Sequence, residues 1–284
     1  MTDAVVRVED LRKTYAGGVD ALRGVSFQID RGETFALLGP NGAGKSTTIE
    51  ILEGYRDRTS GVVEVLGTDP HHGGLDWKAR LGIVLQSTGE APAASVREQL
   101  AHFAAFYPNP RDVDEVIAAV GLTEKAKTSI RKLSGGQRRR VDVALGIVGR
   151  PELLFLDEPT TGFDPEARRS FWDLIRRLQD EGTTILLTTH YLDEAAELSS
   201  RAAIIANGTM AALGRIDELG GEDARVPIVR WRENGMVREE RTENPGALVA
   251  RLSTDGEPDR LEVIRPSLED IYLSFVGTQQ EVTA

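Results

Sequence analysis

The chain has 284 residues, of which 40% are hydrophobic and 28% charged, so it can bury a core of ordinary size and is not expected to be disordered. Its formal net charge of -11 repels phosphate backbones and argues against binding to nucleic acid. The lack of cysteine excludes disulfides, thiolate nucleophiles and thiolate metal sites.

The sequence offers no obvious route into a membrane. No apolar run approaches the roughly 18 residues that a spanning helix needs. Residues 1–7 lack the basic region and the apolar stretch of a secretory signal. If the protein serves a membrane, we expect it to do so from the water side.

The N-terminal part is predicted to be rich in strands. The first 35 or so residues suggest strands joined by turns at Gly17–Gly18 and Arg31–Gly32. Thr34–Leu38 is a short apolar run that leads into a glycine-rich loop, and Lys45–Gly54 is predicted to be a helix.

The middle of the chain alternates between strand and helix patterns. Leu153–Leu156 and Thr184–Leu187 are continuous apolar runs, which are typical of parallel strands covered on both faces. Val96–Tyr107 and Glu166–Glu181 are predicted to be helices. This alternation predicts an α/β core with a mainly parallel sheet.

The pattern changes after about Leu219, where glycines and charges suggest a linker. A hairpin around Asn234–Gly235 is followed by a helix, a strand and a last helix with Ser267 as its cap. The predicted segments are Val226–Trp231, Met236–Arg241, Pro245–Leu252, Leu261–Ile264 and Ser267–Phe275. We therefore expect a large domain at 1–219 and a small accessory α+β domain at 220–284.

The glycine-rich loop fits the phosphate-binding pattern Gly-x4-Gly-Lys-[Ser/Thr]. Its glycines let the backbone curl so that N–H groups point inward, and the next helix adds its positive end. Lys45 supplies charge for the β and γ phosphates, and Ser46 offers a ligand for Mg²⁺. The residues expected to bind ATP here are Gly39, Pro40, Asn41, Gly42, Ala43, Gly44, Lys45, Ser46 and Thr47.

Two acids, Asp157 and Glu158, follow the apolar run at Leu153–Leu156. The carboxyl end of a strand is where α/β sheets bind ligands. Asp157 is expected to hold Mg²⁺, and Glu158 to polarise the attacking water. A charged start of a loop is the simpler alternative, and the phosphate loop disfavours it.

The pentad Leu133–Gln137 reads Leu-Ser-Gly-Gly-Gln. Ser134 and Gln137 also fit a helix capping box, a purely structural alternative. A cap alone does not need two glycines, since each costs about 1 kcal/mol in a helix. Glycines there make sense if a bulky anion must approach the backbone.

The pentad resembles the signature of ABC ATPases, and the resemblance extends over about residues 5–215. It implies a phosphate-loop NTPase core, an N-terminal antiparallel β subdomain and a helical signature subdomain. It also implies a homodimer in which two subunits sandwich two ATP molecules head to tail. The pentad residues that would contact the opposite subunit's ATP are Ser134, Gly135, Gly136 and Gln137.

Other positions match this family in order. Tyr15 stands where an aromatic ring stacks on adenine, although alone it would suggest core packing. Gln86 matches a glutamine that joins the Mg²⁺ site to the transmembrane contact, and His190 matches a switch histidine that contacts the γ-phosphate. Asp164 matches an aspartate that crosses the dimer interface, while Phe163 replaces the commoner leucine. With Glu158 and His190 both present, we expect hydrolysis and not binding alone.

Two stretches, Thr160–Pro165 and Pro266–Tyr272, resemble the drug-resistance exporter branch of the daunorubicin-resistance type. The resemblance implies an ATPase at the cytoplasmic face of the membrane that drives export of a drug, antibiotic, lipid or glycan. A separate permease would carry the substrate. A groove near Gln86 and the helix at Val96–Tyr107 are expected to dock it, with core packing an equal alternative for that helix.

Two other classes of function remain open. One is a non-transport ABC-type ATPase switch that acts on a soluble partner. The other is a different phosphate-loop enzyme, such as a small-molecule kinase, which a phosphorylated product would reveal.

Overall fold

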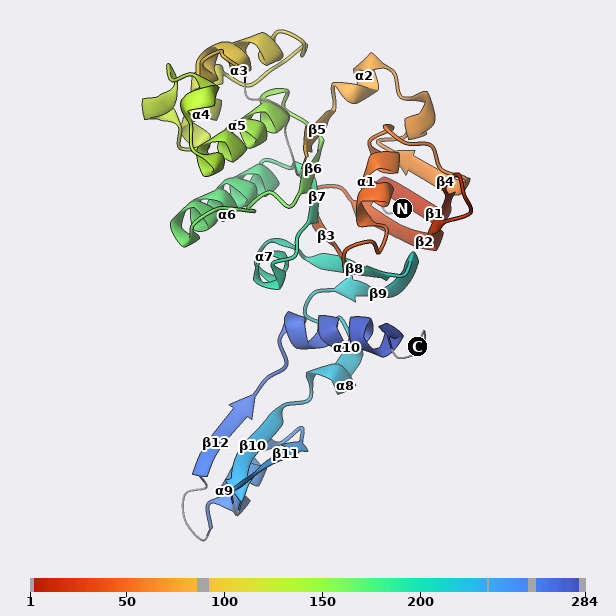
Figure 1. Ribbon diagram of the computed structural model, residues 1–284, viewed down its shortest axis with the longest axis vertical. Coiled ribbons are helices and arrows are strands. Elements are labelled where there is room, and N and C mark those ends of the chain that lie inside the picture. Colours follow the sequence, from red (N-terminus) through yellow and green to blue (C-terminus); the bar gives the residue numbers. More distant parts are fainter. Residues whose placement is uncertain (1–2, 86–91, 234, 255–258, 281–284) are drawn as a thin grey trace. The chain divides into compact units, whose positions relative to one another are not determined.

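The computed structural model describes residues 3–85, 92–233, 235–254 and 259–280. It divides into two compact units, residues 1–213 and 214–284 (Figure 1). Each unit is described by itself below. None of the helices in these described ranges combines the length and the apolarity needed to cross a bilayer.

The first unit contains a small antiparallel sheet, as predicted for the N-terminal region. Its strands are β1 (Ala4–Thr14), β2 (Asp20–Asp30) and β4 (Ser60–Val65), in the order β2-β1-β4. The sequence did not reveal β4, which follows the first helix along the chain. Only Val63 and Val65 of this strand are buried, so its apolar pattern is weak.

The main sheet has six strands, and the four neighbouring pairs from β5 to β8 are parallel. In spatial order they are β5 (Leu81–Val84), β6 (Leu153–Asp157), β7 (Thr184–Thr188), β3 (Thr34–Leu38), β8 (Arg201–Ala206) and β9 (Thr209–Arg215). The predicted α/β core is therefore confirmed.

Both faces of this sheet are covered, which explains the continuous apolar runs. Along β6, Leu153 and Phe155 belong to one buried cluster, and Leu154 and Leu156 belong to another. The first cluster includes residues of the antiparallel sheet and of α1 (Lys45–Leu52). The second joins the sheet to helices on the opposite face.

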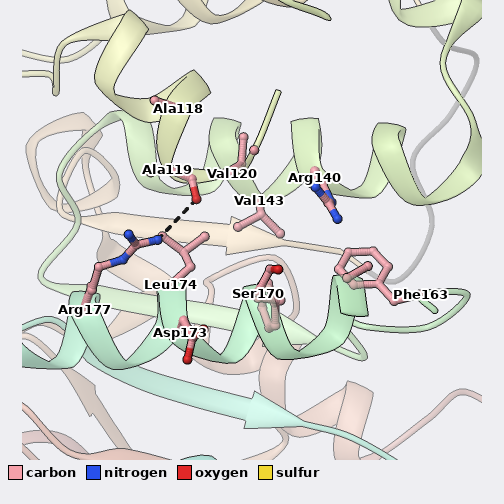
Figure 2. Close-up of a pocket in the computed structure, with 13 residues that line it drawn as sticks. Ala118, Ala119, Val120, Arg140, Val143, Phe163, Ser170, Asp173, Leu174 and Arg177 are labelled. Carbon is pink, nitrogen blue, oxygen red and sulfur yellow. Dashed lines mark hydrogen bonds between the residues drawn. The ribbon is translucent and has the colours of Figure 1, made fainter. Parts of the chain in front are cut away.

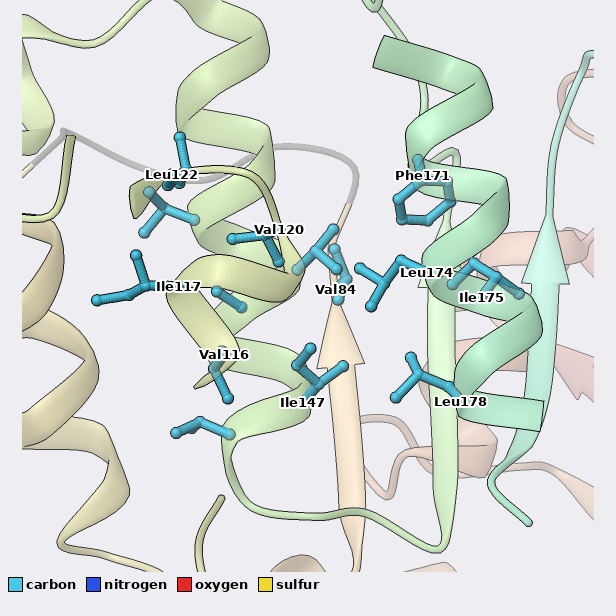
Figure 3. Close-up of a cluster of buried hydrophobic side chains, with 14 of the residues drawn as sticks. Val84, Val116, Ile117, Val120, Leu122, Ile147, Phe171, Leu174, Ile175 and Leu178 are labelled. Atoms are coloured by element: carbon cyan, nitrogen blue, oxygen red, sulfur yellow. The ribbon is translucent and has the colours of Figure 1, made fainter. Parts of the chain in front are cut away.

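The helices of the second cluster include a helical region beyond β5 (Figure 1). This region contains α3 (Val96–Ala104), α4 (Val113–Ala119) and α5 (Gly135–Val148). Short 3-10 turns lie between α4 and α5, at Thr123–Lys125 and Ile130–Lys132, and a third at Pro70–His72 follows β4. The remaining helices are α2 (Leu75–Lys78), α6 (Pro165–Asp180) and α7 (Leu192–Leu198). In Figure 3, apolar side chains of α6 face those of α4 and α5.

The sequence of α6 is that of an amphipathic helix with one apolar face. Phe171, Leu174, Ile175 and Leu178 recur at helical spacing and are all buried, while charged residues occupy the opposite side. Asp164 caps its N-terminus and Pro165 occupies its first turn, where the missing N–H costs nothing.

The second unit is a small α+β fold, as predicted. It contains α8 (Gly221–Arg225), β10 (Ile228–Glu233), β11 (Met236–Arg241), α9 (Pro245–Leu252), β12 (Asp259–Ile264) and α10 (Leu268–Gln280). Its antiparallel sheet has the order β11-β10-β12. Glu233 pairs with Met236, as the predicted hairpin requires, and Asn234 lies outside the described residues.

Candidate functional site

Three predicted motifs follow three neighbouring strands of the main sheet. The phosphate loop follows β3, the acid pair stands at the end of β6, and His190 follows β7. Strands β6, β7 and β3 are adjacent and parallel, so their carboxyl ends lie at the same edge of the sheet. The topology therefore brings these motifs together at the edge where α/β sheets bind ligands.

The phosphate loop needs glycine at two positions for steric reasons. A Cβ at Gly39 would lie 2.2 Å from the carbonyl oxygen of Ile205, and one at Gly44 would lie 2.8 Å from that of Ala21. Both residues also have positive φ, 152° and 109°. The loop is thereby held tightly against the backbone of neighbouring strands, while Ser46 stays exposed at the start of α1.

Lys45 curls back over this loop. Its Nζ donates hydrogen bonds to the carbonyl oxygens of Gly39, at 2.7 Å, and Pro40, at 3.1 Å. Burial lowers the pKa of the Lys45 ammonium, and the negative charges of Glu158 and Asp157 oppose that shift. The ammonium therefore lies within electrostatic reach of both acids and at the loop expected to hold phosphate.

The acid pair is held by β7. The hydroxyl of Thr188 donates a hydrogen bond to the carboxylate of Asp157, and the N–H of Glu158 donates to the carbonyl of Thr188 at 3.0 Å. Glu158 adopts the left-handed backbone conformation, with φ 45°, which a residue with a side chain seldom occupies. Strained backbone of this kind is frequent at active sites.

The carboxylate of Glu158 is partly buried, and its side chain is 14% exposed. It accepts a hydrogen bond from the hydroxyl of Thr161 at 3.4 Å and lies within ion-pair distance of His190. His190 is 49% exposed and packs its ring against Tyr191. A largely buried carboxylate beside an accessible imidazole can orient a water molecule and contact an anion.

Tyr15 is partly exposed and lies beside the helix that follows the phosphate loop. Its hydroxyl and that of Thr47 are 3.0 Å apart, and either one can be the donor. The Nζ of Lys13 lies 5.4 Å from the centroid of the ring, and the guanidinium of Arg56 lies 5.1 Å from it. It is not a core residue, so the packing alternative for Tyr15 is wrong.

The signature pentad begins α5, and its capping box is present. Ser134 Oγ accepts from the N–H of Gln137 at 3.3 Å, and Gln137 Oε1 accepts from the N–H of Ser134 at 3.1 Å. Nothing lies within 4 Å of a Cβ placed at Gly135, and the nearest atom to one at Gly136 is 3.9 Å away. Neither glycine has a positive φ, so nothing within the described chain requires glycine at these positions.

Asp164 and the pentad are predicted site residues for which the described part of the structure shows no hydrogen bond to the phosphate loop. Asp164 is exposed and caps α6, where it accepts from the N–H of Ala167 at 2.8 Å. Within the described ranges, no hydrogen bond or ion pair links the pentad to the phosphate loop. Gln86 lies outside the described residues.

A pocket of about 320 Å³ lies elsewhere in the first unit, between α4, α5 and α6 (Figure 2). Its lining includes Arg140, Phe163 and Arg177, but none of the residues predicted to bind nucleotide. The side chain of Arg177 donates to the carbonyl of Ala119 across it. This pocket is therefore distinct from the predicted nucleotide site.

One residue at the site was not predicted. Arg139 lies two positions after the pentad, is buried, and contacts the backbone of the acid pair. It stands in a run of three arginines, a pattern that ordinarily indicates a solvated helix face. The helical period turns only Arg139, the middle arginine, into the interior. The carbonyl groups that accept its hydrogen bonds are distant in sequence, so no local pattern indicates them.

Comparisons with known proteins agree with this geometry. The family model described as ABC transporter matches residues 22–161. The daunorubicin resistance ATP-binding protein of Streptomyces coeruleorubidus is 32% identical over 99% of this chain and 99% of its own length. The Nod factor export ATP-binding protein of Ralstonia nicotianae is 34% identical over 97% of this chain and 94% of its own length.

Among solved structures, an ATP-binding subunit of an ABC transporter has a TM-score of 0.69 and 26% identity. The match covers 75% of this chain and 90% of that one. The relatives match almost the whole chain, and the phosphate loop, acid pair and pentad all lie in the region that these comparisons cover. The chain therefore belongs to the ATP-binding subunits of ABC transporters, ATPases that hydrolyse ATP to drive transport.

Proposed function

We propose that two copies of this chain bind two ATP molecules head to tail, and that hydrolysis drives export through a separate permease. The observation that supports the dimer is the space at Gly135 and Gly136. Among the described residues, none has an atom within 4 Å of a Cβ placed at Gly135, and the nearest atom to one at Gly136 is 3.9 Å away. Ser134 and Gly135 are exposed at the N-terminus of a 14-residue helix, where N–H groups and the helix dipole favour an anion. The γ-phosphate of a nucleotide held by the second copy has the size and charge to occupy that space.

Within each site, the roles follow from position. Lys45 neutralises phosphate charge, and the loop N–H groups hold the phosphates. Glu158 polarises the attacking water, while the exposed imidazole of His190 contacts the γ-phosphate. Tyr15 stacks on the adenine, because its ring is accessible next to α1.

The donors expected for Mg²⁺ fit that ion. Ser46 supplies an exposed hydroxyl and Asp157 a carboxylate at the strand end, and Gln86 is the proposed third ligand. All three are oxygen donors, which Mg²⁺ prefers. When bound, the ion neutralises phosphate charge and leaves this chain's residues to orient the water.

A groove in the first unit supports docking of a membrane subunit. Its volume is about 660 Å³, and its lining includes Leu75, Phe106 and the ion pair between Arg80 and Glu152. Leu75 is 85% exposed and Phe106 69% exposed, so the groove presents two large apolar side chains that a partner could cover. An amphipathic cytoplasmic segment of a permease would bury both side chains, and the chain would then act at the cytoplasmic face of the membrane.

The substrate class is a drug, antibiotic, lipid or glycan. Relatives of similar identity are named for daunorubicin resistance and for Nod factor export, two chemically different substrates. That difference supports the view that the permease, and not the ATPase subunit, selects the substrate.

The partner is tested by mild solubilisation of membranes from cells that express the tagged chain. A membrane protein with several spans should co-purify with the wild type. This membrane protein should no longer co-purify with the Leu75→Asp and Phe106→Asp variants. It should still co-purify with Val19→Asp, a control at an exposed apolar residue that lines neither the groove nor the pocket. Recovery of the chain only in soluble complexes would instead support the non-transport switch.

A further inference from the structure

The guanidinium of Arg139 binds four backbone carbonyl groups in two separate segments. Nε donates to Pro159 at 3.1 Å, and Nη2 donates to Asp157 at 2.6 Å and to Glu158 at 3.3 Å. Nη1 donates to the carbonyl of Leu85, just after β5. The residue is only 7% exposed, so these bonds are shielded from water.

This arrangement depends on the planar fork of arginine. The nearest carboxylate, Asp142, is 4.0 Å from Nη1, so carbonyl dipoles supply most of the compensation for the buried charge. Five N–H donors in one plane can reach several carbonyls at once, whereas the compact ammonium of lysine cannot reproduce that geometry.

The carbonyls that Arg139 binds belong to the turn that carries the catalytic carboxylate. Asp157, Glu158 and Pro159 are consecutive, and the middle one has the left-handed φ of 45°. A strained conformation persists only where the surroundings hold it in place. Arg139 donates to three carbonyls of this turn, and the N–H of Glu158 in the same turn donates to Thr188 of β7.

We propose that Arg139 is a positioning residue that sets the orientation of Glu158 according to the position of the signature helix in the same chain. Arg139 lies on α5, the helix that the pentad begins. The inference rests on the proposed function, in which the pentad and Glu158 of one copy face different ATP molecules. Arg139 then joins the two nucleotide sites of the dimer through a single side chain.

The chain offers a matched control in the neighbouring residue. Arg138 has the same charge, lies in the same helix turn and is exposed. Substituting it leaves the carbonyls of the acid turn untouched. Differences between equivalent changes at 138 and 139 therefore report the contacts of Arg139 and not the charge of the helix.

The experiment compares Arg139→Lys and Arg139→Gln with Arg138→Lys and Arg138→Gln in the purified full chain. A fluorescent ATP analogue gives the number of sites per chain and the affinity, and phosphate release gives kcat. Misplacement of a reacting group by about 1 Å costs about 10²-fold, so kcat of Arg139→Lys should fall by that order with the number of sites unchanged. The Arg138 variants should keep both values.

A double variant separates positioning from a general structural effect. If Arg139 acts through Glu158, then Arg139→Lys combined with Glu158→Gln should be no slower than Glu158→Gln alone. A multiplied loss would overturn the proposal, as would wild-type kcat in Arg139→Lys. A fall in the number of ATP sites in proportion to kcat would also overturn it, because the role would then be structural.

The two hypotheses fail in different ways. If Glu158→Gln hydrolyses ATP as fast as the wild type, the proposed function is wrong whatever Arg139 does. If Glu158→Gln is inactive while Arg139→Lys is fully active, only the positioning role is wrong.

Discussion

His190 Nδ1 lies 3.4 Å from Glu158 Oε2 across the ends of two neighbouring parallel strands. The two side chains differ in exposure, because the imidazole is accessible and the carboxylate is mostly buried. His190 can therefore reach an incoming phosphate, whereas the Glu158 carboxylate is held within the protein. The first two predictions separate their contributions.

Glu158→Gln should retain ATP binding and lose turnover, because the amide keeps the shape but not the basicity of the carboxylate. Removal of a general base typically costs about 10²–10⁴-fold in rate. An ATP-bound dimer should accumulate, which light scattering can detect. Glu166→Gln, an exposed acid in the first turn of α6, is the control and should remain active. Unchanged phosphate release in Glu158→Gln would remove this carboxylate from catalysis.

His190→Ala should lower kcat by about 10²-fold, on the scale of a lost acid–base or orienting group, with little effect on ATP affinity. In the proposed site, the phosphate loop and Tyr15 would still hold the nucleotide in this variant. His102→Ala, an exposed histidine on α3, provides the comparison. Equal rates for both histidine variants, measured by phosphate release, would exclude a role for His190.

Ser134→Arg should spare ATP binding by the monomer and block closure of the dimer and hydrolysis, because the long cation fills the space at the pentad. The change also removes a helix cap, which costs about 1 kcal/mol by itself. Ser95→Arg is the matched control, since Ser95 forms the same kind of capping box on α3. ATPase activity that survives in Ser134→Arg would contradict the contact between subunits.

Glu53 should make stability depend on pH. Burial, with the charges of Asp157 and Glu50, raises its pKa to about 8. In the unfolded chain the pKa returns to about 4.3, so between these values only the folded state holds the proton. The free energy of unfolding should therefore fall as pH rises from about 5 to 8.

Urea titrations at several pH values test this dependence. Glu53→Gln should flatten the fall across that interval, because the neutral amide has no proton to lose. Glu64→Gln, an exposed acid on β4, should leave the slope as it is. The same slope in the wild type and Glu53→Gln would show that another group is responsible.

The strained backbone at Glu158 predicts that a glycine at this position stabilises the fold, although the loss of the carboxylate abolishes activity. Glycine adopts a positive φ freely, whereas alanine keeps the penalty of about 1–2 kcal/mol. Glu158→Gly should therefore have a higher free energy of unfolding than Glu158→Ala by about 1 kcal/mol, and both should be inactive. Denaturant titration of the pair checks it. Because glycine loses more backbone entropy on folding, a Glu158→Gly variant less stable than Glu158→Ala would mean that the turn carries no strain.

Local patterns predicted the parts of the site that lie along short stretches of sequence. The apolar run before Gly39 and the loop after it define strand, loop and helix together, so β3 and α1 were predictable. The acid pair was predictable for the same reason, since it ends a buried strand.

Non-local relationships were not predictable in this way. The pairing of β4 with β1 depends on register between strands separated by a helix, and half of β4 is exposed. The carbonyls bound by Arg139 lie 18 to 54 positions away along the chain. The capping box at Ser134 was predicted, but only the structure shows that neither adjoining glycine is needed inside the chain.

The C-terminal stretch Pro266–Tyr272 forms the start of α10 and has a structural role there. Ser267 Oγ accepts from the N–H of Asp270 at 3.3 Å, and the Asp270 carboxylate accepts from the N–H of Ser267 at 2.7 Å. Ile271, one residue further on, is almost fully buried. The residues of Pro266–Tyr272 are therefore explained by the cap and the packing of α10. A match to this stretch in another protein would therefore indicate a similarly folded C-terminal unit, and it would not by itself identify a transported substrate.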